Sequence, residues 1–185
     1  MTCNMKKLML PDFFQASEVP IVHKFYRNYF KDCYVCGDVD YIFGPNTAFF
    51  DHCEIHSIAR VSEEKAYITA ASTPAGQEFG LIFSHCRITG EEPDSVYLGR
   101  PWRDCAKTAF ICCELGDHIC PEGWQNWGKV RAEVLSDYIE YGNFGPGADC
   151  SGRSPLSRCL VNPEVETYFS KENVLVGEDG WIPAE

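Results

Sequence analysis

The chain has 185 residues, of which 45% are hydrophobic, so it can bury one sizeable core and predicts a single domain. Its 16 Lys and Arg are outnumbered by 27 Asp and Glu, a formal net charge of -11, which leaves no electrostatic footprint for nucleic acid or an anionic membrane. We therefore expect no nucleic-acid and no membrane partner, and a neutral or mixed-charge ligand fits this composition better.

The first residues predict neither an export signal nor a membrane anchor. Lys6 and Lys7 precede a short apolar run, but Pro11 and Asp12 end it far below the length of a signal peptide. Elsewhere no run approaches the roughly 18 to 20 apolar residues of a membrane-spanning helix. We therefore predict no export signal in this sequence.

A short motif, Phe-x-x-Cys-x-aliphatic, recurs along the chain. It occupies residues 30–35, 50–55, 83–88 and 110–115, with its cysteines at Cys33, Cys53, Cys86 and Cys113. A short unit that repeats at intervals of roughly 20 to 50 residues, and cannot bury its own apolar face, is typical of a solenoid. Equivalent positions on successive coils face the same way, so we expect these cysteines to point inward as small apolar wall residues, mostly reduced or inert.

Strand alternation supports the same interpretation. Side chains alternate with period two in residues 47–50, 66–70 and 96–98, and Gly, Pro, Asn and Asp interrupt the chain between these runs. The predicted fold class is all-β: a right-handed parallel β-helix, a single-stranded solenoid with Phe, Cys and aliphatic ladders stacked inside.

Several cysteines and histidines leave alternatives open. Eleven cysteines would suggest a disulfide framework with one thiol left over in a secreted protein, and Cys33 and Cys53 would then be close enough to bridge. Cys33 and Cys36 form a CxxC pair, but zinc or redox chemistry is disfavoured, because no second CxxC and no nearby histidine pair accompanies them. His52 and His85 each precede a repeat cysteine, which favours a turn at the coil edge over metal binding.

The amino-acid composition of the chain changes after the repeats. Residues 121–127 and 141–148 are rich in Gly, Pro and aromatic residues and predict long ordered loops. We interpret Trp124 and Trp127 as structural.

A short C-terminal helix is predicted after these loops. Asn162 is the expected N-cap, with Pro163 in the first turn. Because Val165, Tyr168 and Phe169 fall on one helical face, the helix should pack back against the coil.

Two motifs each enclose one charged side chain in an apolar, restricted frame: residues 39–44, Val-Asp-Tyr-Ile-Phe-Gly, and residues 98–102, Leu-Gly-Arg-Pro-Trp. The carboxylate of Asp40, in a strand-like run, is costly to bury unless a cation pairs with it, and Arg100, restricted by the proline that follows, is the partner we predict. Such a pair keeps a carboxylate ionised and oriented, as a nucleophile or general base requires. Asp38 is the competing carboxylate, because strand alternation places it on the face of Asp40.

These motifs resemble those of the pectin methylesterases, whose strands carry D-[FY]-I-F-G and L-G-R-P-W. The resemblance continues at residues 123–127, which match the family's G-W-x-x-W, and at residues 140–148, which match its E-Y-x-N-x-G-P-G-A. It implies a parallel β-helix and a carboxylic ester hydrolase (pectinesterase) that acts on methyl-esterified galacturonan and releases methanol and pectate.

The resemblance also assigns roles to single residues. It implies Asp40 as the nucleophile, Arg100 as the residue that holds it, and Phe43 and Trp102 as platforms for sugar rings. It implies no metal and no cofactor in the reaction, pectin as the partner of a monomeric protein, and a secreted or periplasmic location.

The front of the family's domain is where the resemblance stops. In the family, a Q-D-T-L stretch supplies the acid that protonates methanol and one oxyanion glutamine, and a Q-A-V-A-L stretch supplies another glutamine. Ungapped alignment on residues 29–33 places the Gln-Asp pair at Glu18 and Val19, and no residues correspond to the further stretch. We therefore expect residues 1–185 to be one pectinesterase-like domain, truncated at its N-terminus relative to the family, with little activity unless Glu18 or Asp12 replaces the acid.

Two other functions stay open. An inactive fragment or a non-catalytic galacturonan-binding β-helix would keep Phe43 and Trp102 without carboxylate chemistry. A plain solenoid scaffold is disfavoured, because it gives no reason for an ionisable pair inside two apolar motifs.

Overall fold

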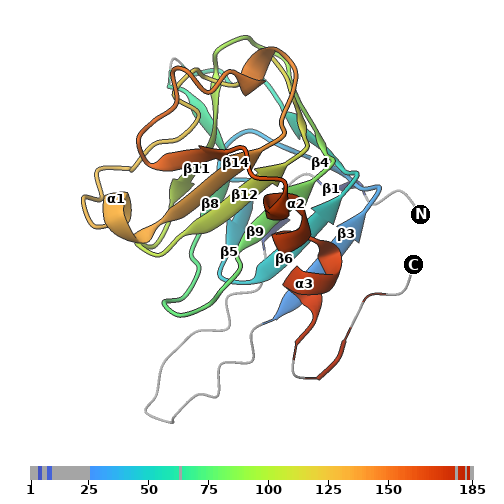
Figure 1. The fold of residues 1–185 in the computed structure, drawn as a ribbon. Helices are drawn as coiled ribbons and strands as arrows, with labels where there is room; N and C mark the ends of the chain where they lie inside the picture. Colours follow the sequence, from blue (N-terminus) through green and yellow to red (C-terminus); the bar gives the residue numbers. More distant parts are fainter. Residues whose placement is uncertain are drawn as a thin grey trace.

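Short strands are the main regular elements of the described chain, and Figure 1 shows them lying side by side. The structure, a computed structural model, describes residues 4–5, 8–9, 26–62, 64–177, 179–181 and 183. The strands are β1 (Asn4–Met5), β2 (Leu8–Met9), β3 (Arg27–Lys31), β4 (Tyr34–Gly37), β5 (Ile42–Gly44), β6 (Thr47–Asp51), β7 (Glu54–Ser57), β8 (Ala66–Ala71), β9 (Leu81–Ser84), β10 (Arg87–Gly90), β11 (Val96–Pro101), β12 (Lys107–Ile111), β13 (Glu114–Leu115), β14 (Asp137–Tyr141) and β15 (Ser157–Leu160). The helices are short: α1 (Ala132–Leu135), the 3-10 helix η1 (Pro146–Ala148), α2 (Glu164–Tyr168) and α3 (Lys171–Leu175).

The strands form three parallel sheets, in the orders β1-β4-β7-β10-β13 (sheet A), β11-β8-β5-β2 (sheet B) and β15-β14-β12-β9-β6-β3 (sheet C). Each of the trios β3-β4-β5, β6-β7-β8 and β9-β10-β11 places one strand in each sheet, so each trio is one coil of a solenoid. Coils stack because short parallel strands can bury their apolar faces only against the next turn. The architecture is the predicted parallel β-helix.

An aromatic ladder runs through the interior, as the repeat motif predicts. Its rings stack with successive centroid separations of 4.8, 4.7 and 4.5 Å, in the order Phe30, Phe50, Phe83 and Phe110. Strand register causes this stacking, because each ring sits directly opposite the next in sheet C. Parallel strands lie about 4.8 Å apart, a spacing at which offset aromatic rings attract each other.

The repeat cysteines form a second inward row, which confirms their predicted orientation. Exposed fractions of 8%, 1%, 1% and 0% belong to Cys33, Cys53, Cys86 and Cys113. The thiol of Cys53 is free, so the disulfide considered between Cys33 and Cys53 is not formed. The Cys53 thiol instead donates to the carbonyl oxygen of Phe30 on the preceding coil at 3.4 Å. Burial raises the pKa of the Cys86 thiol, so this thiol stays protonated and poorly reactive.

Each repeat cysteine follows a residue with a left-handed backbone, at the turn where the chain passes from sheet C to sheet A. These four residues, which we call the edge row, have φ angles of 52°, 51°, 53° and 53° and are Asp32, His52, His85 and Cys112. The rings of His52 and His85 stack with centroids 5.2 Å apart, because the two residues hold equivalent positions on neighbouring coils. The predicted coil-edge turn at both histidines is confirmed.

The last coil keeps this backbone pattern but changes the interior. Gly142, with φ 62°, takes the left-handed position, and Glu140 stands opposite Phe110, where the ladder would place another phenylalanine. Glu140 is 2% exposed, and its carboxylate accepts hydrogen bonds from Arg153 Nε at 2.9 Å, Arg153 Nη2 at 3.0 Å and Trp124 Nε1 at 2.9 Å. A fully bonded buried ion pair thus ends the aromatic ladder.

The segments predicted as loops carry little regular structure. Residues 121–127 contain no strand. Of residues 141–148, Tyr141 is instead the last residue of β14, and residues 146–148 form η1. Trp124 is 1% exposed and stacks on Tyr138 at 4.2 Å between ring centroids, which agrees with its structural interpretation. A disulfide joins Cys150 to Cys159, a pairing that the sequence did not predict.

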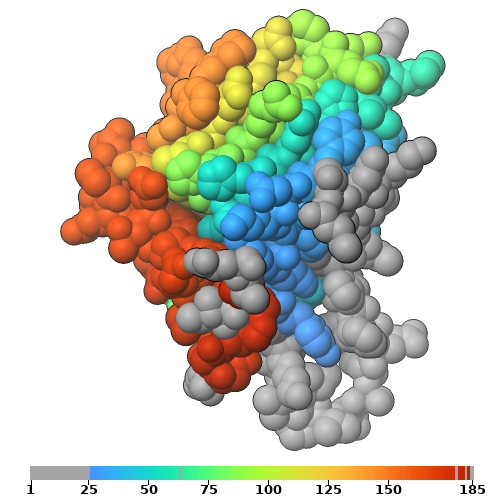
Figure 2. All heavy atoms as spheres, turned by 90° about the vertical axis from the view of Figure 1, so that its right-hand side faces the viewer, coloured from blue at the N-terminus to red at the C-terminus, as the bar shows by residue number. Residues whose placement is uncertain are grey.

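The predicted C-terminal helix is present as α2, and α3 follows it. Asn162 Oδ1 accepts a hydrogen bond from the backbone N–H of Glu164 at 3.0 Å, as an N-cap does. Figure 1 shows both helices covering one face of sheet C, and they bury Val165 and Phe169 in a second apolar cluster with strand residues of that sheet. In Figure 2 this C-terminal segment lies against the blue region that contains β3, where Arg27 Nη1 donates to the carbonyl oxygen of Leu175 at 2.8 Å. Among the described residues, no helix has the length and apolar character of a bilayer span.

Candidate active site

Asp40 and Arg100 form the predicted ion pair, although they lie 60 residues apart in the chain. Arg100 Nε donates to Asp40 Oδ1 at 3.0 Å, and Arg100 Nη2 donates to Asp40 Oδ2 at 2.6 Å. The side chains of Arg100 and Asp40 are 15% and 24% exposed, so the pair is open to solvent on one side. Fork-to-fork pairing of this kind fixes the orientation of the carboxylate as well as its charge.

The topology of sheet B explains how the two residues meet. Asp40 precedes β5, Arg100 belongs to β11, and β8 lies between these strands. Arg100 stands opposite Ala70 in register, and the methyl side chain of Ala70 leaves room for the guanidinium to reach toward β5. The site is therefore assembled from three successive coils.

The backbone at Asp40 differs from the prediction. Residues 38–40 form a bend, and Asp40 has a left-handed backbone with φ 46°, so it does not lie in a strand-like run. Asp is one of the few residues that tolerate this conformation, which costs roughly 1–3 kcal/mol when surrounding structure holds it. Here the backbone N–H of Asp40 donates to the carbonyl oxygen of Tyr67 at 2.7 Å. The strand-alternation argument for Asp38 fails for the same reason; its carboxylate accepts from the N–H of Val39 at 2.9 Å.

Two aromatic rings hold the Arg100 guanidinium, and the sequence reasoning missed both. The Cζ atom lies 3.9 Å from the ring centroid of Tyr67 and 4.1 Å from that of Trp127. Trp127 is 44% exposed, so its interpretation as a structural tryptophan was incomplete: it covers the cation of the candidate site. Neither contact has a local signal, because Tyr67 comes from β8 and Trp127 from a loop.

Phe43 and Trp102, the predicted sugar platforms, lie together. Their ring centroids are 5.2 Å apart with an interplanar angle of 48°, and both side chains are partly exposed. Beside Trp102 is a hollow of about 430 Å³, lined by residues 72–75, residues 102–105 and Lys129. An aromatic ring next to an open hollow is a surface on which a sugar ring can stack.

Lys129 anchors the loop that carries Trp127. Its Nζ donates to the carbonyl oxygens of Pro101 at 2.8 Å and Trp102 at 2.6 Å, and it lies 4.6 Å from the Trp127 ring centroid. Burial, with the nearby positive charge of Arg103, lowers the pKa of the Lys129 ammonium. Lys129 thus ties this loop to the strand end that follows Arg100.

Chemically, the site presents an ionised carboxylate that one arginine orients and that two part-exposed aromatics border. A carboxylate held this way can attack an ester carbonyl or activate water. The residues considered for the acid step, Asp12, Glu18 and Val19, lie outside the described residues.

Comparison with known proteins identifies one family along most of the chain. The pectinesterase family model matches residues 15–178. The chain is 39% identical over 140 residues to pectinesterase 31 of Arabidopsis thaliana, and this alignment covers 75% of this chain and 43% of that protein. It is 33% identical over 157 residues to putative pectinesterase 11 of Arabidopsis thaliana, and this alignment covers 84% of this chain and 43% of that protein.

Solved structures agree with this result. The pectin methylesterase from carrot matches with a TM-score of 0.74 at 29% identity, over 83% of this chain and 51% of the carrot chain. A pectin methylesterase solved in complex with a hexasaccharide matches with a TM-score of 0.68 at 27% identity, over 85% of this chain and 53% of that chain. The chain thus spans about half the length of these solved proteins and 43% of the two curated relatives. On the family match and the level of identity, the chain belongs to the pectinesterase family.

Proposed function

We propose that this chain acts as a carboxylic ester hydrolase on methyl-esterified galacturonan, and that it releases methanol and pectate. The observation that carries the proposal is the bidentate Asp40–Arg100 pair, half-open to solvent beside Phe43 and Trp102. Buried or surface ion pairs are common, but a carboxylate in a left-handed turn, held by one arginine and bordered by open aromatic rings, fits a nucleophile better than a structural bridge.

The proposed reaction assigns each described residue one role. An Asp40 oxygen attacks the ester carbonyl carbon, the carbon–methoxy bond breaks, and the methoxide takes a proton from solvent water to leave as methanol. A second water then attacks the mixed anhydride and gives up its protons to solvent, which restores the Asp40 carboxylate and gives the free galacturonate. Arg100 holds and aims the Asp40 carboxylate, while Trp102 and Phe43 support the sugar rings.

Turnover is expected to be slow. Methoxide is a poor leaving group, so protonation matters, and Val19 stands where the family has its acid in an ungapped alignment. Replacing a general acid with an aliphatic residue costs on the order of 10² to 10⁴ in rate. We propose that residues 1–185 form a single domain that corresponds to the C-terminal part of the family's catalytic domain.

The proposed partner is the pectin chain, bound by a monomer. A solved relative binds a hexasaccharide, which supports an oligosaccharide ligand. Esterified galacturonan is neutral, so the net charge of -11 does not repel it, although each hydrolysed ester adds a negative charge that the protein does repel. The substrate belongs to the cell wall, so the proposed working location is secreted or periplasmic.

Methanol release from highly esterified pectin tests the proposal. We expect slow release by the purified chain, below the roughly 1 to 10³ per second of ordinary enzymes, and none by Asp40→Asn. Asp38→Asn is the matched control, because Asp38 is an exposed carboxylate in the same bend. Equal release by both variants, or release no faster than without protein, would show that Asp40 is not the nucleophile.

A second candidate is a non-catalytic galacturonan-binding module, which the Phe43–Trp102 pair favours because stacking needs no carboxylate. Affinity electrophoresis in esterified pectin separates the two. If the chain binds pectin, loses binding in Trp102→Ala, keeps it in Asp40→Asn and releases no methanol, the binding module is the correct function.

A further inference from the structure

A cluster of potential metal ligands lies away from the candidate active site, at the turn between sheets C and A. His85 and Cys112 are neighbours in the edge row, and Glu166 reaches them from α2. One ligand atom from each of these three residues lies within 4.8 Å of the other two. Asp40, in contrast, lies where the chain passes from sheet A to sheet B.

The coil fixes the spacing of the first two ligands. Ser84 stands opposite Ile111 in sheet C, so the residues that follow, His85 and Cys112, are also neighbours. The backbone N–H of His85 donates to the carbonyl oxygen of Ile111 at 2.9 Å. Both residues have φ 53°, so their side chains leave the turn in the same direction. Neighbouring parallel strands lie about 4.8 Å apart, a distance that one metal ion can bridge when the side chains tilt toward it.

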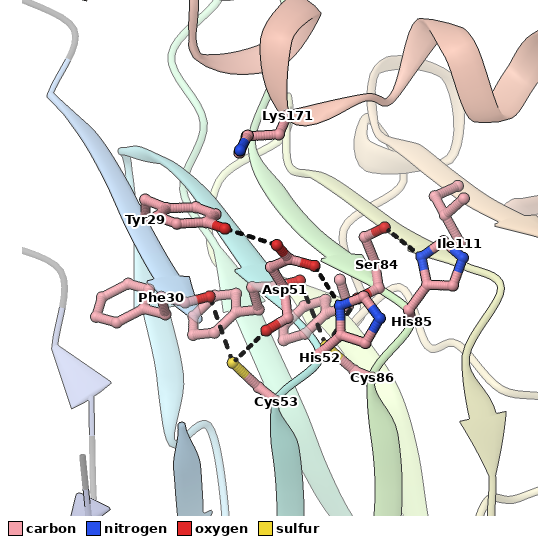
Figure 3. A network of polar contacts seen from close by, with 12 residues as sticks. Tyr29, Phe30, Asp51, His52, Cys53, Ser84, His85, Cys86, Ile111 and Lys171 are labelled. Atoms are coloured by element: carbon pink, nitrogen blue, oxygen red, sulfur yellow. Dashed lines mark hydrogen bonds and ion pairs between the residues drawn. The ribbon is translucent and has the colours of Figure 1, made fainter. Parts of the chain in front are cut away.

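The imidazole of His85 is already oriented for a ligand. Ser84 Oγ lies 3.0 Å from His85 Nδ1, a contact drawn in Figure 3, and this bond leaves Nε2 free to face outward. Nε2 lies 3.8 Å from Glu166 Oε1. A second hydrogen bond that fixes the ring and its tautomer is the usual support of a metal-binding histidine.

Glu166 is held in place by the packing of its helix. Val165 and Phe169, its neighbours in and just after α2, are 9% and 8% exposed and belong to the second apolar cluster. The side chains of His85 and Glu166 are themselves 42% and 53% exposed. An ion in solution can therefore reach all three ligands without a change of fold.

We propose that His85 Nε2, the Cys112 sulfur and a Glu166 carboxylate oxygen bind one divalent transition-metal ion, with zinc as the ion that best suits this nitrogen, sulfur and oxygen set. Water would complete a tetrahedral shell. The thiolate and the carboxylate neutralise both charges of the ion, and the thiol proton is released to solvent when the sulfur–metal bond forms. Bond lengths of about 2.0 to 2.3 Å require the ligand atoms to close to about 3.3–3.8 Å, a small rotation for exposed side chains.

Such an ion would cross-link α2 to the coil edge, and the described disulfide does not do this. Because it binds only where all three ligands meet, it would stabilise the folded chain in proportion to its occupancy. The ion has no part in the ester chemistry proposed for Asp40, so this inference stands apart from the proposed function.

Titration of the reduced, metal-free full chain tests the site. We expect one equivalent of Zn²⁺ to bind and to raise the midpoint of thermal unfolding, and one equivalent of Co²⁺ to produce a sulfur-to-cobalt charge-transfer band. Cys112→Ser should remove the band and weaken Zn²⁺ binding at least about tenfold, and His85→Gln and Glu166→Gln should weaken it similarly. Ser84→Ala should have a smaller effect in the same direction, because it only loosens the ring.

The matched control is Cys105→Ser, which removes another partly exposed free thiol. It should leave the Co²⁺ band and the Zn²⁺ affinity unchanged. His85 and Glu166 are exposed, and circular dichroism of each variant checks that the fold is kept. A band that survives Cys112→Ser, a band lost in Cys105→Ser, or no binding of either ion would overturn the proposal.

Discussion

Within the described part of the chain, two arginine–carboxylate pairs each join two guanidinium nitrogens to two carboxylate oxygens, and they differ in what remains free around them. In the last coil, Glu140 and Arg153 are 2% and 4% exposed. The carboxylate also accepts from Trp124 Nε1, and Arg153 Nη2 also donates to the carbonyl oxygen of Gly147 at 2.6 Å. At the candidate site, Asp40 and Arg100 are 24% and 15% exposed, and aromatic faces rather than further acceptors surround the cation.

The difference separates a structural pair from one that fits the proposed chemistry. A buried pair that is closed to solvent holds neighbouring segments together and offers a ligand no accessible carboxylate oxygen. A half-open pair stabilises the fold little, because water screens it, but it keeps an oriented carboxylate accessible. Removing one partner should therefore affect stability in the last coil and chemistry at the candidate site.

The largest effect on stability is expected from Arg153→Met. This change leaves the Glu140 carboxylate buried without its cation and should lower the free energy of unfolding by about 3–5 kcal/mol. Urea denaturation measures it. The control is Arg158→Met, whose pair with Asp137 is 60% and 38% exposed and should matter by less than about 1 kcal/mol. Similar losses in the two variants would remove the distinction between buried and open pairs.

A buried ionisable group without a partner sharpens the comparison. His118 is 1% exposed, and neither ring nitrogen has a hydrogen-bond partner in the described structure. Burial lowers its pKa from 6.5 to about 4, so between these values the unfolded chain binds a proton that the folded chain does not. Stability should be unaffected above pH 6.5, fall by about 3 kcal/mol as the pH drops to about 4, and level off below.

His118→Leu isolates this contribution, because leucine fills much of the same space without titrating. Urea denaturation of both proteins at several pH values gives the difference. His85→Leu is the control, since its side chain is 42% exposed and its ring bonds to Ser84. If His118→Leu keeps the full decline of stability between pH 6.5 and 4, the decline comes from other groups.

A smaller change in stability is expected when the open pair is broken. Asp40→Asn should alter the free energy of unfolding by at most about 1 kcal/mol, because the pair is screened and Asn also tolerates a left-handed backbone. The same variant is the one expected to lose methanol release. A loss of stability as large as that of Arg153→Met would mean that Asp40 is a structural residue.

The smallest effect concerns the ring over Arg100. Trp127→Ala removes the cation–π contact with Arg100, worth about 0.5–1 kcal/mol at an exposed site, together with the contact to Lys129, and should slow Asp40-dependent methanol release about two- to fivefold. Trp181→Ala is the control, because Trp181 lies 5.4 Å from the Arg27 Cζ on another part of the surface. Equal rates in the two variants would show that Trp127 does not position Arg100.

Local repetition made much of the fold predictable. Each Phe-x-x-Cys unit reports the same coil geometry, so the ladders, the inward cysteines and the edge turns at His52 and His85 followed from the pattern. The Asp40–Arg100 pair was also predictable, because burying one charge in each of two apolar motifs requires a partner. The left-handed backbone of Asp40 was not predictable, because apolar neighbours such as Val39 and Tyr41 are equally compatible with a bend and with a short strand.

The parts that were missed depend on contacts between residues that do not follow the sequence repeat. Tyr67 and Trp127 reach Arg100 from different elements, and the Glu140–Arg153 pair replaces a phenylalanine that the ladder pattern would have placed there. The Cys150–Cys159 disulfide was missed because 11 cysteines allow many pairings and the repeat drew attention to the inward row. Residues outside a repeat have to be placed by tertiary structure.

The order of sheet B has a consequence for how the site arises during folding. Asp40 and Arg100 belong to the first and third of the coils β3-β4-β5, β6-β7-β8 and β9-β10-β11, and β8 separates them. A partly folded chain with only the first two coils docked has Asp40 and Tyr67 in place but no guanidinium near the carboxylate. Non-local contacts of this kind are formed late, because their loop-closure entropy is offset only after intervening structure has formed. The carboxylate proposed as the nucleophile is thus oriented only in chains whose coils have stacked in the correct register.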